Sequence, residues 1–367
     1  MPNSKIKRIF VSATDQNNGK TVVSLGLIYA FEERFKRVGF IKPVGQRYVI
    51  EQGKKVDEDS VLIEKTFDID CPVKDMSPVA VERGFTKKYI LKSGRRELVK
   101  RIKNSFKAVS KNKDIVVIEG TGHAGVGSVF DLSNAAVAKI LNSKVIIVSS
   151  GGIGKPIDEI MLNRALFEKE GVEVVGAIIN KVRPDKYNKV NEIVRIGLKR
   201  KGLKVLGVIP YNKILSEPTV RQVAEELGFN ILNGGKALDA TVGKILVGAM
   251  APHDALNYFS DKSLLITPGD REDMILAVVG FQMDRVKKGI QMAGIVLSGG
   301  IKPHHAVVDL VKRANIPLLL AKGDTYNVAS KIHDLKVKVK PEDTEKTNII
   351  KNMIEKYVDI KMLSRHL

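Results

Sequence analysis

Apolar residues in the first part of the chain form short continuous runs that alternate with stretches of apolar residues at helical spacing. Runs that are apolar on both faces and are separated by helices are typical of parallel strands buried in a sheet. We therefore predict an α/β domain with a doubly wound, mainly parallel sheet over residues 1–214. Its strands are expected in the run from Arg8 and at 39–44, 114–119, 144–149, 172–180 and 205–211, and its helices at 21–35, 56–67, 97–111, 156–170 and 185–201. Residues 70–95 are expected to be irregular.

The same alternation restarts at Pro218 and continues to the end of the chain. It predicts a second, smaller α/β domain over residues 215–367. The expected helices are 219–227, one between the first two strands, 270–288, 303–314, 324–334 and 342–358, and the expected strands are 244–250, 263–267, 293–298, 316–321 and a brief one near 336–339.

The polar turn after the first apolar run ends in Gly19-Lys20-Thr21 and leads into a helix. Loop amides and the first helical turn have no helical partners, so this arrangement can hold a nucleotide's phosphates. Lys20 would reach the β- and γ-phosphates, and Thr21 would bind Mg²⁺. Thr14 stands where the strict pattern has glycine, so the alternative is an ordinary turn with a surface lysine. The expected nucleotide-binding residues of this loop are Thr14, Asp15, Asn17, Asn18, Gly19, Lys20, Thr21 and Val22.

Charged residues also fall at the predicted ends of other strands. Lys42 precedes Pro43 at the end of one strand, and Glu119 ends another, directly before a glycine-rich turn. Ligands of open α/β sheets bind at this carboxyl edge, where a carboxylate can hold Mg²⁺. The plainer alternatives are a solvated lysine and a carboxylate that bonds to the loop. Asp59 is in the first turn of a helix, where an acid ordinarily complements the helix dipole.

Composition narrows the class of protein. The 367 residues are 44% hydrophobic and 28% charged, with a net charge of +20 and one cysteine, Cys71. That composition is typical of a globular protein, and one cysteine excludes an intramolecular disulfide. The basic residues are spread over nearly every predicted helix, which argues against nucleic-acid binding as the main role. With no apolar span and no signal core, we expect a cytoplasmic protein that does not bind membranes.

Several of these motifs together resemble the dethiobiotin synthetase-like P-loop family, which shares its fold with cobyrinic acid a,c-diamide synthase. The matching segments are Thr14–Thr21, Lys42-Pro43, Asp59–Leu62, Glu119–His123, Asn180 and Gly207–Tyr211. The resemblance implies that ATP and Mg²⁺ are bound, with Thr21, Asp59 and Glu119 at the metal. It further implies that Lys20, Lys42 and Glu119 act in catalysis and that Asn180 and Pro210 contact the nucleobase.

The second domain resembles a DRTGG domain. Leu265–Arg271 and Leu297–Gly300 match its two signature turns, with Ser298 in place of threonine. These turns would line a second ligand's site, the alternative being purely structural turns. The residues expected there are Asp270, Arg271, Ser298, Gly299 and Gly300.

The pair of domains is similar to the N-terminal half of long bacterial phosphotransacetylases. The acetyl-transferring domain does not follow in this sequence, so we expect that the protein is not itself an acetyltransferase. One hypothesis is an ATPase or ATP-dependent ligase-type enzyme that phosphorylates a small carboxylate-like acceptor. The other is a regulatory module that senses ATP and an effector and acts on a separate acyltransferase or kinase. We expect a homo-oligomer, as a dimer.

Overall fold

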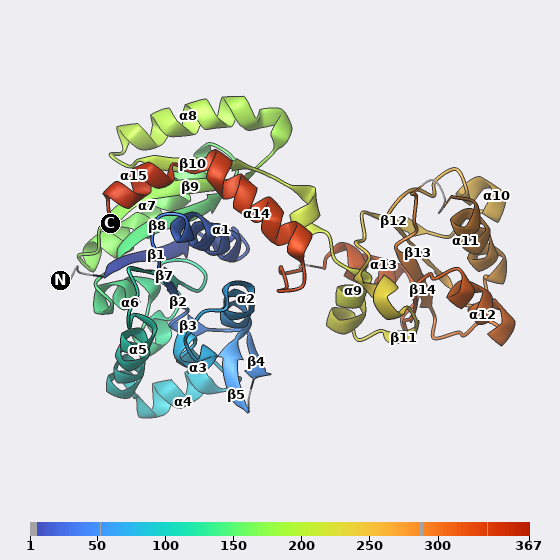
Figure 1. Ribbon diagram of the computed structural model, residues 1–367, viewed down its shortest axis with the longest axis horizontal. Helices are drawn as coiled ribbons and strands as arrows, with labels where there is room; N and C mark the ends of the chain where they lie inside the picture. Colours follow the sequence, from blue (N-terminus) through green and yellow to red (C-terminus); the bar gives the residue numbers. More distant parts are fainter. Residues whose placement is uncertain (1–5, 52, 286–288, 336) are drawn as a thin grey trace. The chain divides into compact units, whose positions relative to one another are not determined.

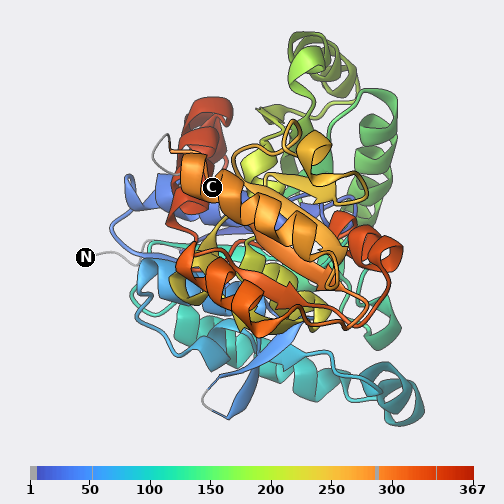
Figure 2. The ribbon, with the colours of Figure 1, turned by 90° about the vertical axis from the view of Figure 1, so that its right-hand side faces the viewer.

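The computed structural model describes residues 6–51, 53–285, 289–335 and 337–367, and the chain divides into two compact units. The first unit holds the described residues up to Asn212 together with Val339–Leu367, and the second holds Lys213–Lys338. Each is an α/β unit with a mainly parallel sheet (Figures 1 and 2).

The first unit is built on a six-stranded sheet in the order β10-β9-β8-β1-β7-β2, with all neighbours parallel. These strands are apolar and buried along most of their length because helices cover both faces of the doubly wound sheet. The strands are β1 (Lys7–Ala13), β2 (Val38–Ile41), β7 (Ile115–Glu119), β8 (Lys144–Ser150), β9 (Val174–Val182) and β10 (Val205–Pro210). The helices are α1 (Lys20–Glu32), α2 (Glu58–Phe67), α3 (Val73–Met76), α4 (Phe85–Lys92), α5 (Arg95–Val109), α6 (Asn134–Ile140), α7 (Gly154–Lys169), α8 (Tyr187–Arg200), α14 (Thr344–Tyr357) and α15 (Ile360–Arg365).

Residues 70–95, expected to be irregular, contain helices α3 and α4 and the short strand β6 (Val79–Ala80), which pairs with β3 (Val44–Gly45). The sequence pattern also missed a hairpin of β4 (Tyr48–Glu51) and β5 (Lys54–Asp57). These elements are short, and each buries too few side chains to show a clear period in the sequence.

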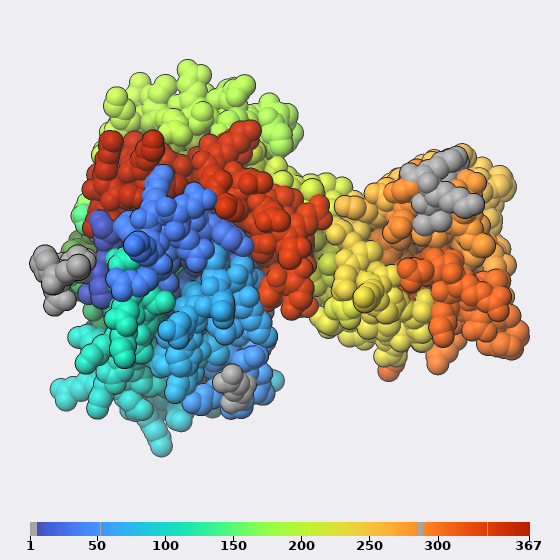
Figure 3. Space-filling view, in the orientation of Figure 1, coloured from blue at the N-terminus to red at the C-terminus, as the bar shows by residue number. Residues whose placement is uncertain are grey.

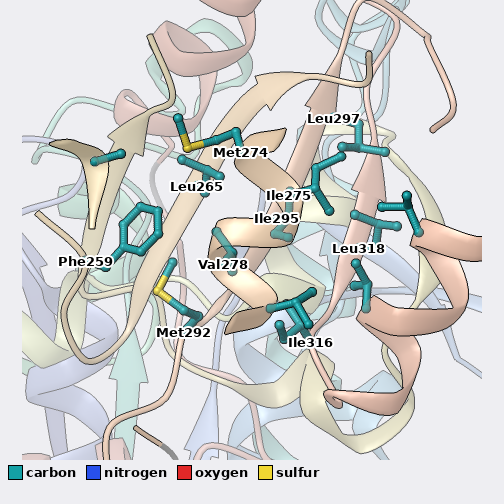
Figure 4. Close-up of a cluster of buried hydrophobic side chains, with 14 of the residues drawn as sticks. Phe259, Leu265, Met274, Ile275, Val278, Met292, Ile295, Leu297, Ile316 and Leu318 are labelled. Carbon is teal, nitrogen blue, oxygen red and sulfur yellow. The ribbon is translucent and has the colours of Figure 1, made fainter. Parts of the chain in front are cut away.

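The second unit has a five-stranded sheet in the order β11-β15-β14-β13-β12, in which only β11 is antiparallel. Alternate residues of β13 and β14 enter two apolar clusters. Leu265 and Ile295 belong to the cluster that contains Met274 and Val278 of α11 (Figure 4), and Leu264 and Val296 belong to the other. The strands are β11 (Asn230–Asn233), β12 (Lys244–Val247), β13 (Ser263–Pro268), β14 (Gly294–Ser298) and β15 (Leu318–Leu320), and the helices are α9 (Val220–Leu227), α10 (Pro252–Ala255), α11 (Glu272–Arg285), α12 (His305–Arg313) and α13 (Thr325–His333). The last residues of the helix expected over 270–288 lie outside the described residues.

The C-terminal segment differs from the sequence expectation, because the chain returns to the first unit at Val339. Helix α14 packs on α1, where Gly26 leaves room for Ile350 and Ile354, and a Cβ at Gly26 would overlap Ile354. Asp359 then donates its N–H to Leu206 O of β10 at 2.8 Å. The strand expected near 336–339 is absent from its described residues, 337–339, and residue 336 lies outside the description.

The single cysteine, Cys71, lies in the loop between α2 and α3 and is half-buried. Burial, followed by the nearby Asp75 carboxylate, raises the pKa of its thiol to about 11. Since only the thiolate is nucleophilic, we expect alkylation of Cys71 by iodoacetamide at pH 8 to be about 100-fold slower than that of an unhindered model thiol. Intact-mass spectrometry over time measures this rate, and labelling as fast as that of a model peptide would contradict the expectation.

Candidate nucleotide site

The phosphate loop joins β1 to α1 and ends at Gly19, which has φ +90°. This left-handed conformation favours glycine, and a Cβ there would overlap the Asn180 side chain. Among the described residues, the backbone N–H groups from Asn17 to Val22 have no hydrogen-bond acceptor. Such a row of free amides at a helix N-terminus suits an anion.

Thr14 occupies the position where the strict loop pattern has glycine, and its side chain holds the start of the loop in place. Its hydroxyl hydrogen-bonds with Ser149 at 3.0 Å and donates to Glu159 of α7, also at 3.0 Å. The Asn18 carboxamide donates to the same hydroxyl at 2.8 Å. The departure from the strict pattern therefore adds a side-chain anchor to the loop. Ser149 and Glu159 are contributors that the sequence analysis did not identify.

Two residues at the end of β9 hold the other end of the loop. The Asn180 amide donates to Asn18 O at 3.0 Å, and Lys181 Nζ donates to Asn17 O at 2.6 Å. In a trans peptide the carbonyl and the next N–H point in opposite directions. Holding these two carbonyls therefore turns the N–H groups of Asn18 and Gly19 away from β9 and leaves them available.

The hydrogen bond from Asn180 to Asn18 O predicts that Asn180 affects ATP binding by fixing the phosphate loop. Asn180→Ala removes the bond to Asn18 O, so the loop amides are less well fixed and ATP should bind about tenfold more weakly, the worth of one buried hydrogen bond. Calorimetry measures the Kd, and Asn188→Ala on the exposed surface of α8 is the matched control. An unchanged Kd in Asn180→Ala would contradict the role.

A cluster of charges lies beside the loop. Lys42 follows β2, and its ammonium group pairs with Asp59 of α2, with Asp57 at 3.1 Å and with Glu119 at 3.3 Å. All four side chains are almost completely buried. Burial alone would lower the pKa of Lys42, but the carboxylates of Asp59, Glu119 and Asp57 raise it well above its ordinary value. Lys42 therefore remains charged.

Glu119 connects this cluster to the phosphate loop. Its Oε1 accepts from the Thr21 hydroxyl at 3.0 Å, while its Oε2 is buried and has no hydrogen-bond partner among the described residues. Lys20, which donates to Asp15 O at 3.2 Å, is also buried. Burial lowers the pKa of Lys20 to about 8, against the opposing effect of Glu119. A buried carboxylate oxygen without a partner calls for a donor or a cation.

The oxygen donors here fit a magnesium ion. Thr21 in the first turn of α1 offers a hydroxyl, and Asp59 and Glu119 offer two carboxylates that share the Lys42 ammonium group. The described residues contain no group of three His, Cys, Asp or Glu side chains that could hold a metal by itself. Mg²⁺ at nucleotide sites normally takes one or two carboxylates and completes its shell with phosphates and water, so this donor set is compatible with it.

The structure thus brings the residues expected at the first site to one edge of one sheet. Asp57 is an addition that the sequence analysis did not identify; it caps α2, where its side chain accepts from Asp59 N at 3.0 Å. Pro210 ends β10 and pairs with Val182 of β9. Asp15 and Asn17 are exposed, and Val22 is partly buried in the first turn of α1.

The turns of the second unit also meet at one edge, since Pro268 and Ser298 are neighbours in register. The Arg271 guanidinium is bound by the Asp273 carboxylate at 2.9 and 3.0 Å and by Met250 O at 3.1 Å. Ser298 hydrogen-bonds with Thr325 at 2.7 Å. Gly299 and Gly300 have φ of +78° and +69°, and their N–H groups donate to backbone carbonyls of Gly323 and Ala321. In this structure the polar groups of Arg271, Ser298, Gly299 and Gly300 thus have protein partners, and Asp270 lies on the surface beside them.

Comparison with known families agrees with the division of the chain into two units. A model of the AAA domain family matches residues 7–219, which is more than half of the chain. The chain belongs to the AAA domain family. A model of the DRTGG domain matches residues 222–335, so the family's domain is followed here by a second recognised one.

Curated relatives match nearly the whole length of the chain. The phosphate acetyltransferase of Pseudomonas putida is 29% identical over an alignment of 379 residues, gaps included. The alignment covers 98% of this chain and 51% of the relative. That of Nitratidesulfovibrio vulgaris is 26% identical over 369 residues, with the same coverage. The chain therefore spans about half the length of these relatives, consistent with the N-terminal half of long phosphate acetyltransferases.

Among solved structures, a plasmid partition protein from Borrelia burgdorferi bound to AMPPNP is 14% identical. The match covers 57% of this chain and 88% of that chain, with a TM-score of 0.39. No helix in the described ranges is both long and apolar enough to span a membrane.

Proposed function

We propose that the first unit binds ATP with Mg²⁺ at the loop between β1 and α1. The observation that carries the proposal is the arrangement around Glu119. Its Oε2 has no hydrogen-bond partner among the described residues, its Oε1 accepts from the Thr21 hydroxyl in the first turn of α1, and its charge acts on the buried Lys20. Amides and Lys20 suit the phosphates, whereas the carboxylate suits the cation that accompanies them.

Thr21, Asp59 and Glu119 would hold the metal. The chemistry that Mg²⁺ supplies is neutralisation of negative charge on the β- and γ-phosphates. Lys42 keeps Asp59 and Glu119 in place through its own ion pairs. We further propose that Pro210 and the exposed Tyr211 lie near the nucleobase, because the Asn180 carboxamide is engaged with the loop.

The bound ATP is proposed to be consumed in an ATPase or ligase-type reaction. A carboxylate-like oxygen of a small acceptor forms a bond to the γ-phosphorus while the bond from that phosphorus to the β,γ-bridging oxygen breaks, and ADP leaves. Lys20 and Lys42 place two buried cations near this end of the site, where fixed positive charge stabilises charge that develops during transfer. Acyl and carbamate groups are acceptors of this class.

A second candidate is a regulatory module without acceptor-stimulated turnover, favoured by how much of the relatives' length the chain covers. The chain spans about half of proteins that are named phosphate acetyltransferases. ATP bound to the first unit and an effector bound to the second would then control a separate acyltransferase or kinase. In this version the site binds ATP tightly and hydrolyses it slowly.

Release of ADP that depends on an acceptor distinguishes the enzyme from the regulatory module. The purified protein is first titrated with ATP, ADP and GTP, with and without Mg²⁺, in a thermal-shift assay, where a ligand at 100 times its Kd should stabilise by about 2.7 kcal/mol. ADP release is then measured with panels of small carboxylates and amines. Stimulation by an acceptor supports the enzyme, and binding without stimulation supports the module. Absence of any nucleotide binding would sink both.

A further inference from the structure

Lysine and arginine are concentrated in one short segment, although the sequence pattern suggested an even spread. Residues 83–113 contain 12 of the chain's 61 basic residues and one of its 41 acidic residues, so this segment carries +11 of the net +20. Its basic residues are Arg83, Lys87, Lys88, Lys92, Arg95, Arg96, Lys100, Arg101, Lys103, Lys107, Lys111 and Lys113. The segment comprises α4 and α5, labelled at the lower end of the first unit in Figure 1.

Helix α5 presents part of this charge as a stripe. Its buried residues, among them Leu98, Ile102 and Phe106, face the unit's core. Arg96, Lys100, Lys103 and Lys107 recur at the spacing of one helical face, opposite the core, and all four are exposed. The space-filling view shows this part of the chain at the surface (Figure 3).

These charges are uncompensated. None of the twelve basic residues forms an ion pair with a carboxylate in the part of the chain that the structure describes, whereas other surface cations of the unit do, as in Lys139–Glu170, Lys144–Glu173 and Arg164–Glu168. Within the described ranges, Arg95 and Arg101 donate only to backbone carbonyls, those of Asp131 and Pro78. Like charges at this density repel each other, and an anionic partner would relieve the repulsion.

Helix α4 adds an apolar tip. It is held along one edge by Phe85 and Tyr89, whose rings lie 5.3 and 6.2 Å from the ring of Phe130. No residue of α4 is fully buried, and Ile90 and Leu91 are 65% and 72% exposed. This aliphatic pair is flanked on the same short helix by Lys87, Lys88 and Lys92.

We propose that α4 and α5 form a docking surface for an anionic lipid bilayer. The exposed aliphatic pair would enter the boundary between headgroups and acyl chains, while the lysines of α4 and the basic stripe of α5 contact lipid phosphates. A nucleic acid would match the charge, but its backbone offers no apolar surface for Ile90 and Leu91. The Tyr89 ring, which could stack on a base, is packed against Phe130. Attachment of this kind needs no spanning helix, so the lack of an apolar span, from which we expected no membrane binding, does not argue against it.

The test is co-sedimentation of the full chain with vesicles of phosphatidylglycerol and phosphatidylcholine, compared with phosphatidylcholine alone. The triple variant Lys100→Glu, Lys103→Glu, Lys107→Glu should bind the anionic vesicles at least roughly tenfold more weakly. The matched control is Lys189→Glu, Lys199→Glu, Arg200→Glu on α8, which makes the same change in net charge and should lose less than about threefold. Ile90→Ser with Leu91→Ser should weaken binding and leave its salt dependence unchanged. Circular dichroism checks that each variant is folded.

Three results would overturn the proposal. The first is no preference for anionic over neutral vesicles. The second is an equal loss in the two triple variants, which would show a general charge effect with no localised surface. The third is retention of duplex DNA or single-stranded RNA by a protein that does not bind vesicles, which would assign the surface to nucleic acid.

Discussion

Replacing Lys20 with alanine should reduce any acceptor-stimulated release of ADP at least about 100-fold and weaken ATP binding at least about tenfold. Lys20 is buried at the start of α1, and it belongs to the same run of residues as the free loop amides. Its ammonium group would therefore meet the same phosphates as those amides. Radiolabelled ATP measures turnover, and calorimetry measures binding.

The control for this variant is Lys169→Ala, because Lys169 is an exposed lysine at the end of α7, another helix of the first unit. It should leave both quantities unchanged. If Lys20→Ala bound ATP as tightly as the parent protein, the nucleotide site would have to lie elsewhere, and the proposed function would fall with it. If binding were lost in a protein without detectable turnover, the regulatory version would stand.

Replacing Lys42 with methionine should produce the largest loss of stability of any single substitution at the site. The change leaves the carboxylates of Asp57, Asp59 and Glu119 buried without the cation to which they are bound. Breaking a buried ion pair from one side typically costs about 3–5 kcal/mol. For a unit of this size that loss corresponds to a fall in Tm of roughly 6–20 °C.

The pH dependence of this effect has a definite sign. Because the pKa of Lys42 is raised in the folded protein, its contribution is fully present below the ordinary lysine value of 10.5 and is lost only as the pH rises through the folded value. Lys139→Met, which breaks an exposed pair with Glu170, should cost less than about 1 kcal/mol. A Tm for Lys42→Met close to that of Lys139→Met would contradict the structure.

The sequence predicted the central sheet of the first unit because its strands are long, apolar on both faces and separated by amphipathic helices. Lys42, Glu119 and Asn180 could be assigned to one edge for the same reason, since parallel strands bring their carboxyl ends together. Hydrogen bonds that depend on backbone conformation could not be predicted. Lys181 reaches Asn17 O from a left-handed conformation, with φ +58°, and nothing in the sequence indicates this.

The second unit shows a different limit. Its two turns were expected to line a ligand's site together with Arg271, and the structure brings them to one edge of the sheet, where Pro268 and Ser298 are neighbours in register. The Arg271 guanidinium is held by Asp273 and by a carbonyl from the loop after β12, and such partners depend on how loops fold over the sheet. The helix expected over 342–358 was itself correct, as α14 shows. The sequence could not reveal that this helix packs on α1, because its apolar stripe would suit either unit.

The return of the chain to the first unit has a consequence for how the protein is made. During synthesis, residues up to Asn212 leave the ribosome before the second unit exists, and α14 follows only after it. Until then α1 lacks the side chains of Ile350 and Ile354 that cover Gly26, so an apolar strip on the nascent first unit stays open to water. The second unit is continuous in sequence and can complete its own core first. Chaperones would therefore bind the first unit, which emerges before the second, and this surface would be covered only once α14 has been made.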